Sequence, residues 1–114
     1  METKFYKNIE FAPVNKIKDI QDKLLKEHIL YCRKNSNHYR KVFKQVNFKE
    51  INLNKLSLLP FTDKGLLEKH NDDFLGADRK DIVDIVLSSG TTGKSTKIFY
   101  TESDLNRLSY NEKQ

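Results

Sequence analysis

The chain has 114 residues, of which 37% are apolar and 32% are charged. A chain of this length forms one small domain, and its low apolar fraction predicts a thin core and some surface that other parts of a protein would cover. It holds no apolar run long enough to cross a membrane, and its first six residues lack the apolar core of a signal peptide. The single cysteine, Cys32, excludes an intrachain disulfide. These features predict a soluble, cytoplasmic protein.

The net charge of +5 is unevenly distributed. Residues 1–50 carry 12 Lys/Arg and 6 Asp/Glu, whereas residues 51–114 carry 9 and 10. The basic residues of the first half are scattered among acidic ones, without a run of arginines or a platform of aromatic residues. We therefore interpret them as solvated surface and expect neither a nucleic-acid nor a membrane partner.

Apolar residues at helical spacing predict two helices in the first half of the chain. The first runs from about Pro13 or Asn15 to Lys34, and Pro13 suits a first-turn position. The second runs from Asn37 to about Lys44. This second helix is expected to bury three side chains: Tyr39, Val42 and Phe43.

The second half of the chain predicts shorter elements. Residues 48–59 can hold one turn of helix before Pro60, and Thr62 is the predicted N-cap of a helix from Asp63 to about His70. Two β-rich runs then predict a hairpin, and a last helix opens near Thr101 or Ser103 with Asp104 in its first turn. The hairpin strands are residues 82–87 and 97–100, after turns at 71–73 and 76–78. The predicted fold class is α+β, mainly helical.

The connection between the two predicted strands has an unusual composition. Ser88–Thr96 contains six Ser/Thr residues, Gly90, Gly93 and Lys94. Glycine permits close approach of the backbone to a ligand, so successive N–H groups, hydroxyls and one ammonium group can surround an oxyanion. The pattern predicts a phosphate-binding loop, and a plain polar turn is the alternative.

Two kinds of nucleotide loop are candidates for this segment. A P-loop needs glycine at position 88, where Ser88 stands, and a helix directly after Lys94 and Ser95. The residues that follow, 97–101, favour a strand. The P-loop interpretation therefore fails on two counts.

The sequence Ser-Ser-Gly-Thr-Thr-Gly-Lys at residues 88–94 resembles the signature of adenylate-forming enzymes. Thr96 agrees with the phenylacetate–CoA ligase branch and its capsule-biosynthesis relatives, whereas Ser95 stands where that family has proline. Three further segments are similar to that branch in the same order along the chain: residues 35–43, 56–67 and 100–105.

The resemblance implies the N-terminal part of a longer enzyme with a partial adenylate-forming fold. Residues 1–80 would be its helical N-terminal region, and residues 81–114 the start of its nucleotide-binding domain, truncated here. The parent would be an ATP-dependent acid–CoA ligase that uses ATP, Mg, a carboxylic acid and CoA. The family's phosphate-binding residues correspond to Ser88, Ser89, Gly90, Thr91, Thr92, Gly93 and Lys94.

By this resemblance the fragment carries no catalytic residue, binds no cofactor tightly and is inactive alone. The alternatives are a P-loop-like nucleotide-binding domain and a small protein-interaction module, with a homodimer formed through exposed strand edges. His28, His38 and His70 lie in three separate segments without metal-ligand spacing, so no metal site is predicted. Cys32 is expected to be a buried structural thiol.

Overall fold

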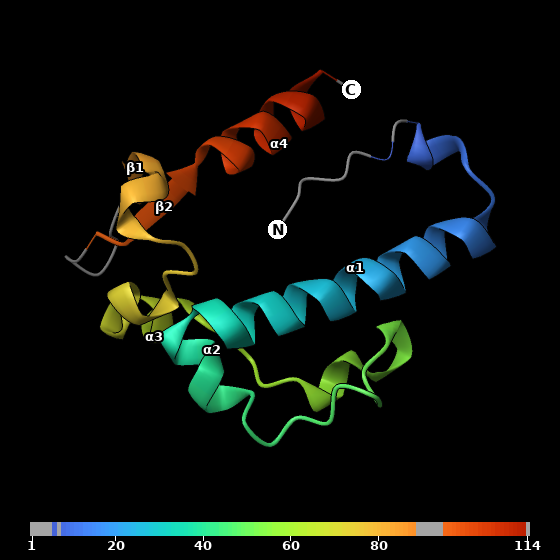
Figure 1. Ribbon diagram of the computed structural model, residues 1–114, viewed down its shortest axis with the longest axis horizontal. Helices are drawn as coiled ribbons and strands as arrows, with labels where there is room; N and C mark the ends of the chain where they lie inside the picture. Colours follow the sequence, from blue (N-terminus) through green and yellow to red (C-terminus); the bar gives the residue numbers. More distant parts are fainter. Residues whose placement is uncertain (1–5, 7, 89–94, 114) are drawn as a thin grey trace.

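The computed structural model describes residue 6, residues 8–88 and residues 95–113. Four α-helices and one β-hairpin form the main elements of this part of the chain, and α1 spans the width of the molecule in Figure 1. The helices are α1 (Val14–Asn35), α2 (Asn37–Val42), α3 (Lys64–Lys69) and α4 (Glu102–Glu112). The strands are β1 (Ile82–Leu87) and β2 (Lys97–Thr101). The predicted α+β, mainly helical class is confirmed.

Short 3-10 helices connect these elements. They are η1 (Ile9–Phe11), η2 (Leu53–Leu58), η3 (Asn71–Phe74) and η4 (Arg79–Asp81). The turn of helix predicted within residues 48–59 is η2. No helix in the described part of the chain is both long and apolar enough to cross a membrane.

Ser36 separates α1 from α2. Its backbone is extended, with φ −108° and ψ 128°, so it ends one helix and begins the next. Its N–H donates to the Cys32 carbonyl at 2.9 Å, and its side-chain oxygen accepts from the Tyr39 N–H at 3.3 Å. Ser36 is thus the N-cap of α2, a position that favours serine because its hydroxyl satisfies a free helical N–H.

The hydrophobic core is small. Among the described residues, Ile29, Phe43 and Ile51 are the buried apolar side chains. Ile29 comes from α1, and six partly buried residues pack against the cluster: Leu25, Cys32, Tyr39, Val46, Phe48 and Leu59. The thin core predicted from the composition is therefore present in the fold.

Two predictions about individual residues in this region were wrong. Val42 was expected to be buried, but it is 37% exposed because α2 ends there and only Phe43 turns into the core. The N-cap of α3 is Asp63 and not Thr62: the Asp63 carboxylate accepts from the Leu66 N–H at 2.7 Å. The Thr62 hydroxyl instead lies 3.1 Å from the Tyr39 hydroxyl.

The hairpin and the helix after it agree with the sequence. β1 and β2 pair antiparallel, from Ile82 opposite Thr101 to Leu87 opposite Lys97, with an irregularity between Ile82 and Asp84. Thr101 then caps α4: its hydroxyl accepts from the Asp104 N–H, and the Asp104 carboxylate accepts from the Thr101 N–H. This reciprocal capping box fixes the direction in which α4 leaves the sheet.

The Ser36 hydroxyl should contribute more to stability than an exposed serine. Ser36 is 1% exposed, and Ser36→Ala removes its contacts with Tyr39 and with the Asp73 carbonyl. We expect the free energy of unfolding to fall by about 1–3 kcal/mol, measured by urea denaturation. Ser109→Ala, on the exposed surface of α4, is the matched control and should change it by less than about 0.5 kcal/mol. Equal losses at the two positions would contradict this role.

Candidate functional site

The predicted phosphate-binding residues lie on the connection from β1 to β2. The structure describes Ser88 at its beginning and Ser95 and Thr96 at its end. The other predicted site residues lie outside the described part of the chain: Ser89, Gly90, Thr91, Thr92, Gly93 and Lys94. The geometry of the site is therefore that of its two ends and of the groups that hold them.

Two hydrogen bonds join the two ends of the connection. The Ser88 N–H donates to the Thr96 carbonyl at 2.8 Å, and the Thr96 N–H donates to the Ser88 side-chain oxygen at 3.1 Å. The Ser88 hydroxyl oxygen thus takes the place that a backbone carbonyl would occupy in a regular antiparallel ladder. The segment between these residues begins and ends at one point of the sheet.

Thr96 is almost completely buried at this point, with 2% of its surface exposed. Within the described part of the chain, its hydroxyl oxygen has no hydrogen-bond partner. Within the described residues, the backbone groups of Thr96, rather than its hydroxyl, join the two ends of the connection.

Asn71 holds the first residue of β2 from the other side. The Lys97 N–H donates to the Asn71 side-chain oxygen at 2.8 Å, and the Asn71 amide nitrogen donates to the Lys97 carbonyl at 2.9 Å. The amide therefore pairs with β2 as a residue of a third strand would. The sequence analysis missed this role and placed Asn71 only in a turn. The one sequence signal for this pairing is the residue type, because the asparagine side chain carries the same donor and acceptor as a peptide group.

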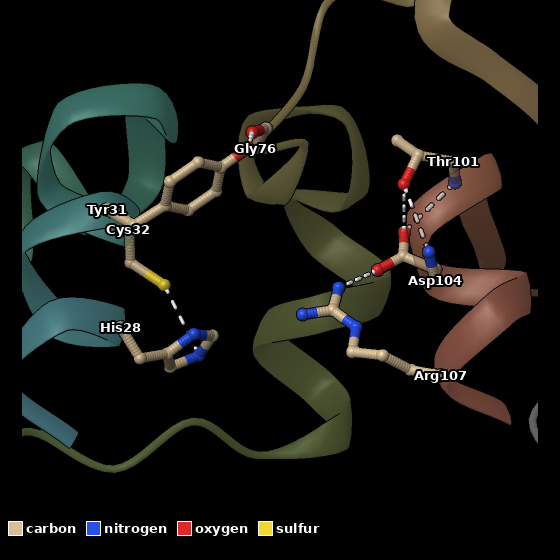
Figure 2. A network of polar contacts seen from close by, with 7 residues as sticks. All are labelled: His28, Tyr31, Cys32, Gly76, Thr101, Asp104 and Arg107. Atoms are coloured by element: carbon tan, nitrogen blue, oxygen red, sulfur yellow. Dashed lines mark hydrogen bonds and ion pairs between the residues drawn. The ribbon is translucent and has the colours of Figure 1, made fainter. Parts of the chain in front are cut away.

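The segment that carries Asn71 is fixed to the helices at three places. The Ser36 hydroxyl donates to the Asp73 carbonyl at 2.9 Å, and the Tyr31 hydroxyl donates to the Gly76 carbonyl at 2.6 Å, as Figure 2 shows for the second contact. The ring of Phe74 stacks on that of His38 with centroids 4.0 Å apart. Residues 71–76 thus connect the α1–α2 corner to the hairpin.

A strand follows the candidate loop. A P-loop requires a helix at this point, with its N-terminus facing the phosphates. The residues after Thr96 form β2, which is paired with β1 along its length. The P-loop alternative is therefore inconsistent with the structure, as the sequence indicated.

A cleft of about 850 Å³ lies beside α1, the start of β1 and α4. Tyr31 from α1 and Arg107 from α4 line it, together with charged residues of both signs. Figure 2 shows Arg107 paired with Asp104, which is also bound to Thr101. Burial raises the pKa of Asp104, but hydrogen bonds from Thr101 and Arg107 outweigh it, so that the pKa lies below its ordinary value of 3.8. The carboxylate is thus committed to capping α4 and binding Arg107.

Cys32 and the histidines form no reactive or metal-binding group in the described residues. Burial raises the pKa of Cys32, so its thiol stays protonated, and its sulfur lies 3.6 Å from the His28 ring. Cys32 packs against the core but is half-buried, whereas the sequence analysis expected it to be buried. His38 and His70 face each other elsewhere with ring centroids 6.4 Å apart. No cluster of three His, Cys, Asp or Glu residues suited to a metal occurs in the described part of the chain.

Comparison with known proteins identifies relatives of one kind. No protein-family model matches the chain. It is 34% identical over 101 residues to the phenylacetate-coenzyme A ligase of Aromatoleum evansii and 32% identical over 101 residues to that of Thermus thermophilus. Each match covers 85% of this chain but only 23% of the relative. Over most of its length the chain is thus similar to one segment of each of these two phenylacetate-coenzyme A ligases, which confirms the resemblance found in its motifs.

The stacked imidazole of His38 makes stability depend on pH. Burial lowers the pKa of His38 below 6.5, and the charges of His70 and Lys41 lower it further, whereas Asp73 raises it. As the pH falls below 6.5, the unfolded chain gains this proton before the folded chain does. The free energy of unfolding should therefore fall between about pH 7.5 and the folded pKa, and His38→Gln should reduce this slope in urea titrations. An NMR titration that puts the pKa of His38 at or above 6.5 would contradict the prediction.

Proposed function

We propose that this chain supplies the phosphate-binding loop of an ATP-dependent acid–coenzyme A ligase. One observation carries the proposal: the match to two phenylacetate-coenzyme A ligases spans 85% of the chain. A continuous match of that extent includes residues 88–94 wherever it begins. The Ser/Thr/Gly-rich segment thus belongs to the part of the chain that resembles these enzymes.

The loop residues have the chemistry that a triphosphate requires. In the proposed reaction a carboxylate attacks the α-phosphorus of ATP, which gives an acyl-adenylate and releases pyrophosphate; a thiol then displaces AMP. Backbone N–H groups of Gly90 and Gly93 and the hydroxyls of Ser88, Ser89, Thr91 and Thr92 would donate to phosphate oxygens. Lys94 would neutralise the charge that develops on the departing pyrophosphate.

The described part of the chain supports this role through the ends of the loop. The end of β1 and the start of β2 lie side by side, and the hydrogen bonds between Ser88 and Thr96 join the two ends of the connection. A short closed loop can present several donors to one anion at low entropic cost.

The chain alone is proposed to be inactive. It spans 23% of the length of the two ligases it matches, so the groups that bind the acid, the adenine and coenzyme A would come from other parts of a ligase-length protein. Within such a protein we assign residues 1–80 to a helical region and residues 81–114 to the start of the nucleotide-binding domain. A cytoplasmic location is proposed because the single cysteine, Cys32, fits a reducing compartment.

The exposed hairpin surface supports a second candidate function. Val83, Ile85 and Leu87 on β1 are 58%, 52% and 61% exposed. Exposed apolar strands can bind another chain, so the protein could serve as an interaction module or form a homodimer through strand edges. Gel filtration with light scattering separates the two candidates: a stable, well-folded dimer favours the module, and a monomer favours the ligase segment.

Loss of the Lys94 ammonium group or of the Thr92 hydroxyl should slow the adenylation half-reaction but not thiol transfer. The test replaces the matching segment of the Thermus thermophilus ligase with this chain and introduces Lys94→Ala or Thr92→Val. Losing one well-placed donor should slow formation of the acyl-adenylate by about 10²–10³-fold. Thiol transfer from supplied acyl-adenylate should hardly change, because pyrophosphate has already left. Equal losses in both half-reactions would indicate a purely structural loop.

Restoring the family proline provides the converse experiment. Ser95→Pro in the same chimera should leave adenylation unchanged or faster, because proline restricts the exit of the loop and Ser95 is not among the proposed phosphate-binding residues. The substitution requires that the backbone of Ser95 adopt an angle proline can take and that its N–H and hydroxyl make no essential hydrogen bond. Adenylation rates are measured by pyrophosphate exchange, and a marked loss would show that this loop has a different exit from that of the family.

The isolated chain should bind ATP weakly. Charge-assisted hydrogen bonds contribute about 1.5–3 kcal/mol each, and association costs about 4 kcal/mol or more. With a phosphate loop as the main contact, the dissociation constant should be about millimolar or weaker. Isothermal titration calorimetry checks this, and micromolar binding to the 114 residues alone would mean that they contain a complete nucleotide site.

A further inference from the structure

The outer edge of β2 has an unusual partner at its first residue. The Thr96 carbonyl accepts from Ser88 on the β1 side, and the peptide groups of successive residues in a strand point to opposite edges. The Lys97 N–H and carbonyl therefore face away from β1. Both are paired with the single side chain of Asn71, at 2.8 and 2.9 Å.

This pairing requires an amide. The Lys97 N–H needs an acceptor and the Lys97 carbonyl needs a donor, and the primary amide of asparagine offers one of each in a planar group. A carboxylate at position 71 would leave the carbonyl without a donor, and an apolar side chain would leave both groups unpaired. The two hydrogen bonds therefore fix the position of the Lys97 backbone along the strand as well as its distance from η3.

Asn71 is held by η3, which is itself fixed to the helices. The Asp73 carbonyl accepts from Ser36, a residue that is 1% exposed. The Phe74 ring stacks on His38 of α2 at 4.0 Å. Asn71 therefore links the position of the buried corner between α1 and α2 to the start of β2. That start lies one residue after Thr96, whose two hydrogen bonds with Ser88 are called the Ser88–Thr96 closure below.

We propose that Asn71 is a positioning residue for phosphate binding: by holding the Lys97 backbone, it keeps the Ser88–Thr96 closure in the geometry that binds the phosphate chain. This inference rests on the proposed function of the connection between β1 and β2. Asn71 hydrogen-bonds the backbone of Lys97, and in this proposal it acts through that backbone and donates nothing to the phosphate itself. Its role is thus separable from that of the donor residues.

The test uses the ¹⁵N-labelled full chain with inorganic pyrophosphate as the probe. Amide hydrogen exchange at Lys97 reports the pairing, and pyrophosphate-induced shifts of the Ser88 and Thr96 amides report binding. Asn71→Ala removes the amide, and Asn71→Gln keeps it on a longer side chain. Asn106→Ala, on the exposed surface of α4, is the matched control. Urea unfolding of each variant measures its global stability separately.

We expect Asn71→Ala to speed exchange at Lys97 about tenfold and to weaken pyrophosphate binding by about three- to tenfold in the folded molecules. Asn71→Gln should fall between Asn71→Ala and the unchanged chain, and Asn106→Ala should match the unchanged chain. If Asn71→Ala remains folded and binds pyrophosphate as tightly as the unchanged chain, the inference is overturned while the proposed function stands.

Two other outcomes are equally decisive. A loss of binding by Asn71→Ala that merely follows its unfolded fraction would make Asn71 a stabilising residue only and would overturn the positioning role. If the unchanged chain shows no response to pyrophosphate up to tens of millimolar while its Lys97 amide is protected, the proposed phosphate-binding function fails, and the inference fails with it.

Discussion

The arrangement of the described elements depends on the buried hydroxyl of Ser36. With Ile29, Phe43 and Ile51 as the buried apolar residues of the described chain, hydrophobic burial alone leaves the orientation of the later segments weakly determined. Ser36 caps α2 and also donates to the Asp73 carbonyl, so one buried group fixes both the bend between two helices and the position of η3. A buried hydrogen bond of this kind contributes about 0.5–1.5 kcal/mol net, and it also makes alternative packings costly, because they would leave the same groups unpaired.

The position of the hairpin depends on η3, because the hairpin has few stabilising contacts of its own. A two-stranded sheet is marginal in water, and the side chains of β1 are largely exposed. Its described support comes from a tertiary contact, that of Asn71 with the start of β2, and from the local capping box that leads into α4. Contacts made by backbone groups can tolerate changes of the neighbouring side chains. They therefore suit a segment whose side chains are proposed to bind a ligand.

Local chemistry explains which sequence predictions were right. The strand–loop–strand order and the start of the last helix near Thr101, with Asp104 in its first turn, depend on residues close together in the chain, so their pattern was sufficient. The errors at Val42 and Thr62 concern choices between neighbours. Thr62 and Asp63 are both good caps, and the structure uses Asp63 while Thr62 lies against Tyr39, 23 residues away. Propensity ranks such residues almost equally, so tertiary contacts decide between them.

The sequence by itself determined the fold class, the approximate bounds of the main elements and, through its motifs, the relation to phenylacetate–coenzyme A ligases. These follow from hydrophobic periodicity, capping residues and a local glycine-rich pattern, each of which is complete within a few residues. The tertiary structure alone decided that Asn71 pairs with Lys97 and that Ser36 holds Asp73. Each of these contacts joins residues at least 26 positions apart, and nothing in their local sequence distinguishes them from ordinary turn or capping residues.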